Sequence, residues 1–131
     1  MKFKQKLWTV GLGLAMAAAP VLAHHSFAAE YDNKQPVEVK GTITKVEWTN
    51  PHARFYVDVT GKDGKVTNWN FELASPNVLV RNGWKRTSLK VGDAVTVSGS
   101  RAKDGAAMAN AASVVLADGK KVFARDQADG Q

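Results

Sequence analysis

Cysteine is absent from the 131-residue sequence, and histidine and methionine occur only three times each. Without cysteine the chain can form no disulfide, thiolate metal ligand or thiol nucleophile. A metal site would therefore need nitrogen and oxygen ligands, with methionine sulfur as the remaining soft donor. Met1 and Met16 lie in a leader that we expect to be removed, which leaves Met108 and excludes a methionine-rich site.

The first 23 residues have the layout of a secretory signal peptide. Lys2, Lys4 and Lys6 precede an apolar run over residues 7–19. That run is shorter than the roughly 20 residues of a membrane span. The following PVLA places small residues before a cleavage point. We expect cleavage after Ala23, a periplasmic or secreted chain, and no membrane span in the mature protein.

Charge gives little support to a nucleic-acid partner. Residues 24–131 hold 15 Lys and Arg against 12 Asp and Glu, a balance of only +3, because three lysines leave with the leader. Nucleic-acid-binding domains usually carry a stronger basic footprint. Tyr56 is also the only aromatic residue expected on the outer face of the strands described below. We therefore expect a small ligand or a protein as partner.

Apolar and polar residues alternate in several short segments, as in half-buried strands. The alternation shifts near Thr44 or Lys45, which indicates a β-bulge, and GKDGK predicts a hairpin turn. Ser75 followed by Pro76 predicts a capped short helix that ends before Asn82-Gly83. The expected elements are an arm over 24–36, strands over 37–48, 52–60 and 66–73, a helix over 76–81, strands over 94–100, 108–116 and 121–124, and a flexible tail over 125–131.

This order of elements predicts an all-β domain over residues 37–124. Three strands, a short helix and two or three further strands match the OB-fold, a five-stranded, partly open Greek-key barrel. We therefore expect an OB-like barrel of five to six strands, with its one helix between the third and fourth strands.

OB-folds bind ligands on the outer face of strands two and three and on the loop before strand two. Here the loop is WTNPH, and parity points Asn68, Asn70 and Glu72 outward while Trp69 and Phe71 point into the core. Such a face is also an ordinary solvated surface, and an exposed Arg54–Glu72 ion pair would contribute little. The expected ligand-binding residues are Trp48, Asn50, His52, Arg54, Tyr56, Asn70 and Glu72.

The histidines form an alternative, metal-binding set: His24, His25 and His52. After cleavage, His24 offers its α-amino group and ring Nδ1 to one metal, and His52 or His25 can complete a three-nitrogen set. Nitrogen-rich tetragonal sites favour Cu(II). This ligand set is similar to the histidine brace of copper monooxygenases. Copper is therefore the cofactor that this alternative implies, and the site requires the arm to fold back onto the WTNPH loop.

Catalysis has little support in the sequence, and we expect no catalytic residue and no enzyme. A hydrolytic triad needs an activated nucleophile beside a histidine and an acid. No G-x-S-x-G context is present, and helix capping explains Ser75.

Five stretches together resemble one bacterial family of small exported proteins of unknown function. They are AHHSFAAEYD, KGTITKVEWTNPHARFYVDV, NWNFELASPNVLVRNGW, LKVGDAVTVSGSRAKDG and LADGKKVF, and they run from His24 to Phe123. HHSF and WTNPH are the most recognisable elements. The resemblance implies an exported single domain and no particular activity. Arg54 departs from the aliphatic or aromatic residue common at that position, so any role for it is particular to this chain.

Overall fold

The computed structural model describes residues 27–124. The predicted leader, His24, His25 and the tail over 125–131 lie outside that range. No helix within 27–124 is long and apolar enough to cross a bilayer. The elements are α1 (Phe27–Glu30), β1 (Tyr31–Glu47), β2 (Arg54–Thr60), β3 (Val66–Glu72), α2 (Pro76–Arg81), β4 (Ala94–Ala102), β5 (Met108–Leu116) and β6 (Lys121–Ala124).

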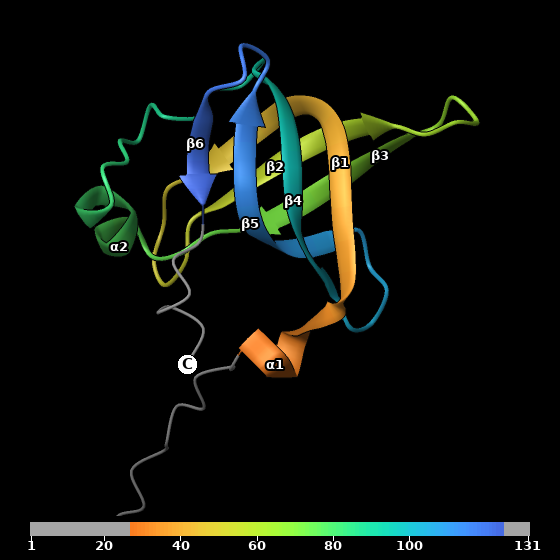
Figure 1. Ribbon diagram of the computed structural model, residues 1–131, viewed down its shortest axis with the longest axis horizontal. Coiled ribbons are helices and arrows are strands. Elements are labelled where there is room, and N and C mark those ends of the chain that lie inside the picture. Colours follow the sequence, from red (N-terminus) through yellow and green to blue (C-terminus); the bar gives the residue numbers. More distant parts are fainter. Residues whose placement is uncertain (1–26, 125–131) are drawn as a thin grey trace, which may run out of the picture.

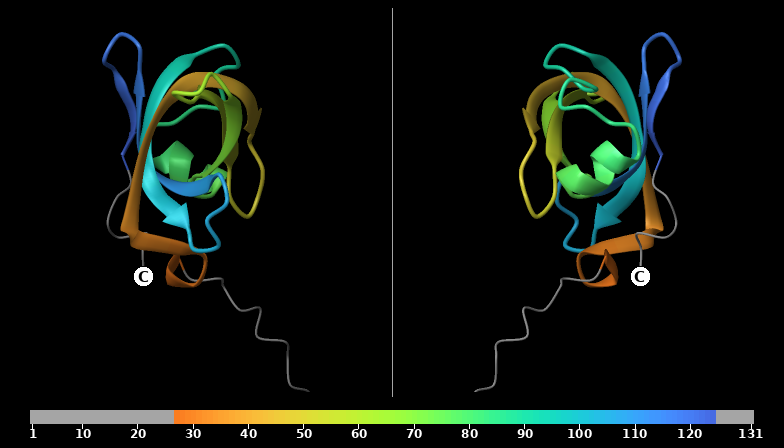
Figure 2. Two further views of the ribbon diagram at one scale, coloured as in Figure 1. Left: turned by 90° about the vertical axis from the view of Figure 1, so that its right-hand side faces the viewer. Right: turned by 90° about the vertical axis from the view of Figure 1, so that its left-hand side faces the viewer.

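The strands form one sheet that curls into a barrel, with the order β3-β2-β1-β4-β5-β6 (Figure 1). A short parallel pairing between β3 and β5, from Asn70 opposite Met108 to Glu72 opposite Asn110, closes it. Figure 2 views the ring from two opposite sides. Five strands closed in this order, with a helix between the third and fourth, define an OB-type barrel. The predicted fold class is therefore confirmed, and β6 extends the sheet beyond the closed ring.

The first strand is longer than its sequence pattern predicts. It begins at Tyr31, which pairs with Ala102 of β4, and not at residue 37. The pairing is irregular between Asp32 and Pro36, where polar residues replace the alternation that identifies a strand. The predicted bulge is present, as a register shift between Ile43 and Lys45 where β1 pairs with β2.

The short helix α2 follows the prediction at both ends. The Ser75 side chain accepts a hydrogen bond from the backbone N–H of Val78, and Pro76 occupies the first turn. Leu79 is fully buried, so α2 covers one end of the barrel core. Phe55 and Phe71 stack inside it with ring centroids 5.3 Å apart. Phe71 therefore lies in the core as expected, whereas Trp69 is only half-buried and packs at its margin.

Candidate functional site

A single buried carboxylate organises the polar residues at the end of β3. Glu72 was predicted to face water, and that prediction is wrong, because the residue is only 5% exposed. The start of β1 brings Tyr31 against it, and β5 pairs alongside it. These two contacts remove Glu72 from solvent, although its parity along β3 is the one expected.

Three side chains from two other strands and a loop bind this carboxylate. The Tyr31 hydroxyl donates to Oε2 at 2.6 Å. Nη2 of Arg54, on β2, lies 2.7 Å from the same oxygen. Nδ1 of His52, in the loop before β2, lies 2.6 Å from Oε1. We call Tyr31, His52, Arg54 and Glu72 the Glu72 cluster.

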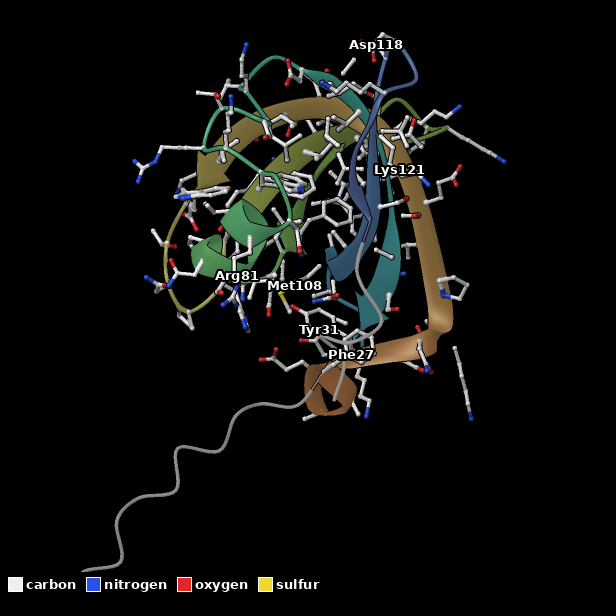
Figure 3. The ribbon with its side chains drawn as sticks, turned by 60° about the vertical axis from the view of Figure 1, so that its left-hand side comes forward. Phe27, Tyr31, Arg81, Met108, Asp118 and Lys121 are labelled. Carbon is white, nitrogen blue, oxygen red and sulfur yellow. The ribbon has the colours of Figure 1, made fainter. Side chains whose placement is uncertain are left out.

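The cluster has a buried side and an open side. Tyr31 is 2% exposed, and Figure 3 shows it at the lower end of the barrel beside Phe27 and below Met108. The side chains of Arg54 and His52 are 30% and 46% exposed. The guanidinium offsets the carboxylate charge from the half-buried side, as a buried carboxylate requires. His52 is therefore the member of the cluster with the greatest access to solvent.

The other predicted ligand residues fall into separate groups. Asn70 joins the cluster through its Oδ1, which accepts from Nη1 of Arg54 at 3.3 Å. The Tyr56 hydroxyl instead donates to Oε2 of Glu47 at 3.3 Å, away from Glu72. Trp48 is half-buried against the core, and Asn50 is exposed in the loop. The predicted surface is thus a compact cluster beside a separate Tyr56–Glu47 pair.

Tyr31 is the residue that sequence reasoning missed. It lay within the expected polar arm and carried no strand alternation. One signal was available: Phe27 and Tyr31 are four residues apart, a spacing that lets two aromatic rings meet over a helical turn. Their rings do stack, with centroids 5.7 Å apart. This contact attaches α1 to the start of β1.

Burial raises the pKa of the Tyr31 phenol above its usual range, and its hydrogen bond to Glu72 adds to the effect. The folded protein thus keeps a proton that the unfolded chain releases near pH 10. Stability from this group is complete below pH 10 and declines above it, by up to about 1.4 kcal/mol per pH unit.

In urea denaturation between pH 8.5 and 11, Tyr31→Phe should reduce this decline of the unfolding free energy at alkaline pH. Tyr56→Phe should retain it, and equal curves for both variants would contradict the assignment.

Metal-binding groups are sparse in the part of the chain that the structure covers. Residues 27–124 contain no group of three or more His, Asp or Glu side chains placed to hold a metal ion. His52 is the only histidine in that range, and its Nδ1 is engaged by Glu72. A three-nitrogen site would need donors from His24 or His25, which lie outside the described residues.

Solved structures with similar folds include nucleic-acid-binding proteins, all at low identity. The mitochondrial single-stranded DNA-binding protein Rim1 of S. cerevisiae matches in two crystal forms. Form 2 is 13% identical over 63% of this chain and 93% of that chain, with a TM-score of 0.48. Form 1 is 10% identical over 63% and 92%, with a TM-score of 0.46. TiaS, in its complex with a tRNA and ATP, is 23% identical over 66% of this chain but only 19% of its own, with a TM-score of 0.47.

The family comparison covers more of the chain. No curated protein matches this sequence. A family model described as a family of unknown function, DUF6152, matches residues 12–111. The match spans well over half of the sequence and includes the whole Glu72 cluster, so the chain belongs to the DUF6152 family of proteins of unknown function.

Proposed function

We propose that this chain is an exported copper-binding protein, in which the mature amino terminus at His24 and the imidazole of His52 hold Cu(II). One observation carries the proposal: Nδ1 of the half-exposed His52 ring lies 2.6 Å from the buried Glu72 carboxylate. A carboxylate behind one ring nitrogen fixes the tautomer and orientation of a metal-binding histidine. It leaves Nε2 of His52 as the free acceptor.

The position of Tyr31 supports the proposal that the amino terminus lies near His52. Its hydroxyl binds the same carboxylate as His52, and its ring stacks on Phe27. Phe27 follows His24 by three positions, and three extended residues span about 10 Å. The β1–β2 loop and α1 also lie toward the same end of the barrel (Figures 1 and 2). We infer that these positions bring His24 to the open side of the Glu72 cluster.

The ligand chemistry favours copper over other divalent ions. After cleavage at Ala23, the α-amino group and Nδ1 of His24 form a chelate, and Nε2 of His52 adds a third nitrogen. Three nitrogens in a tetragonal arrangement suit Cu(II), which also leads the affinity order of first-row divalent metals. An α-amino pKa near 8 lets the metal displace its proton at neutral pH. His25 is the reserve donor.

A broader ligand surface on the outer face of β2 and β3 is the competing proposal. Both guanidinium NH₂ groups of Arg54 already donate within the protein, to Asn70 and Glu72. The Tyr56 hydroxyl donates to Glu47. The side-chain donors of Arg54 and Tyr56 are therefore already used within the protein and are not free to bind a ligand. For that reason we assign Arg54 and Asn70 a supporting role and propose binding of copper without catalysis.

Native mass spectrometry of protein purified from the periplasm of an expressing cell tests the proposal. We expect a chain that starts at His24 and retains one copper but not zinc at equal concentration. His52→Ala should weaken Cu(II) binding by at least about 100-fold. Glu72→Gln should weaken it by about 10- to 100-fold, the range for residues that orient a ligand.

The matched control is Asn68→Ala, which changes an exposed polar residue on β3 whose amide contacts Asp58 and Thr44. It should bind copper normally. A chain retaining an extra methionine before His24 should lose the chelate and behave like His52→Ala. A chain that starts at His24 and stays bare in copper would overturn the proposal, and the outer face of β2 and β3 would then be tested by Tyr56→Ala.

A further inference from the structure

The net charge of the described chain is concentrated in one segment. Residues 73–92, here called the basic segment, contain four Lys or Arg and no Asp or Glu. The rest of residues 27–124 holds ten basic and ten acidic residues and is therefore neutral overall. The segment comprises α2 and the connection to β4, which run along one side of the barrel in Figure 1.

All four cations of the basic segment are exposed: Arg81, Lys85, Arg86 and Lys90. The ion pairs found within residues 27–124 involve Lys45, His52 and Arg54, and none involves these four. The acids that flank the segment have other partners. Glu72 lies in its cluster, and Oδ2 of Asp93 accepts the backbone N–H of Lys90. The four charges thus have no internal counter-charge in the described chain.

Exposed aliphatic side chains accompany these charges. Val80 is 57% exposed and Val91 is 66% exposed, and they are two of the three large hydrophobic residues exposed within residues 27–124. On α2, Asn77, Val80 and Arg81 follow the three- and four-residue spacing of one helix face. Leu79 occupies the opposite, buried face. The exposed residues of this segment therefore include both cations and branched aliphatic groups.

We propose that the basic segment docks the protein on an anionic phospholipid surface. Lys and Arg near such a surface are attracted by its negative potential, and aliphatic groups beside them enter the boundary between head groups and acyl chains. A single-stranded nucleic acid would instead need exposed aromatic rings for stacking. The one aromatic residue of the segment, Trp84, is 7% exposed and belongs to the core cluster. The mix of cations and aliphatic groups thus favours lipid.

Docking there would also bring the Glu72 cluster near the lipid surface. The loop that carries His52 is hydrogen-bonded to the residues just before α2: Ala53 donates to the carbonyl of Ala74 at 3.0 Å, and Leu73 donates to that of Ala53 at 2.8 Å. The start of the basic segment and the loop that carries His52 are thus hydrogen-bonded to each other. The lipid proposal does not depend on copper, and either one can fail alone.

Vesicle co-sedimentation of the full chain tests it, with phosphatidylcholine vesicles that contain either 30% or no phosphatidylglycerol. We expect binding only to the anionic vesicles in 0.1 M NaCl and release in 0.5 M NaCl, where charges are strongly screened. Lys85→Gln/Arg86→Gln should lower the partition coefficient by about 25-fold, about fivefold per charge. Val80→Ser/Val91→Ser should lower it several-fold without changing its salt dependence.

Lys62→Gln/Lys65→Gln is the matched control, because it removes the same charge from exposed positions on the β2–β3 hairpin. It should change vesicle binding by less than about threefold. Circular dichroism confirms that each variant is folded. Equal losses for the two charge pairs, or no binding to anionic vesicles, would overturn the proposal. A different result would be that the protein binds a single-stranded oligonucleotide and no vesicle. If Lys85→Gln/Arg86→Gln then abolishes the oligonucleotide binding, the surface is a nucleic-acid site.

Discussion

Glu72→Ala should lower the free energy of unfolding by about 3–5 kcal/mol, the range for removing one partner of a buried ion pair. The change leaves the Tyr31 hydroxyl, 2% exposed, without its acceptor at 2.6 Å. It also removes the counter-charge of Arg54, whose side chain is 30% exposed, so solvent compensates part of that loss. We therefore expect the lower half of the range. Urea denaturation at pH 7 measures it.

Glu38→Ala is the control for Glu72→Ala, because Glu38 lies exposed on β1 and has no side-chain hydrogen bond or ion pair within the described residues. It should change stability by less than about 0.5 kcal/mol. A loss below 1 kcal/mol for Glu72→Ala would contradict the view that the carboxylate ties β1 to β3. The Glu72 cluster would then be a solvated group that contributes little to the fold.

Gly41→Ala should lower the free energy of unfolding about as much as Glu72→Ala, because of a steric clash and not because of a lost charge. A Cβ at this position would overlap the carbonyl oxygen of Asp58 and would lie 2.8 Å from Cγ1 of Val57. Both obstacles belong to β2, and a backbone carbonyl within a sheet cannot rotate away. β1 and β2 would have to separate beside the bulge. We expect a loss of about 3–5 kcal/mol in unfolding free energy, at the large end for point substitutions.

Gly61→Ala provides the comparison, since the nearest atom to its added Cβ would be Oδ1 of the Asp63 side chain, at 3.0 Å. That side chain can move, so the loss should stay below about 1 kcal/mol. Thermal unfolding of both variants beside the parent protein gives the two values. Similar transition temperatures for all three would show that β1 and β2 can part at Gly41 without disturbing the barrel.

Local sequence signals predicted most of the barrel. The turns, the helix from Pro76 to Arg81 and the bulge near Thr44 each depend on a few neighbouring residues, and the structure has all of them. Alternation placed Phe55, Val57 and Phe71 in the core, because period two determines which face a strand residue occupies. The early start of β1 was missed because residues 32–36 are polar and irregularly paired.

Most members of the candidate site were predictable from the sequence, but Tyr31 and the burial of Glu72 were not. Parity brought His52, Arg54, Asn70 and Glu72 to one surface, and the hydrogen bonds join these four. Parity cannot show what lies above that surface. Tyr31 reaches Glu72 from 41 positions away in the chain, and this contact turns an expected surface acid into a buried one. Burial of that kind depends on long-range contacts that no local pattern encodes.

The pairing of Tyr31 with Ala102 also constrains how the protein is made. The first strand has no partner for its first residues until β4 is synthesised, and the ring cannot close until Asn110 follows. Contacts this distant in sequence make folding slow. A growing chain therefore presents Val37 and Val39 without their β4 partners until β4 is synthesised. Late closure of the barrel leaves the chain unfolded during synthesis, and the proposed export would act on that unfolded state.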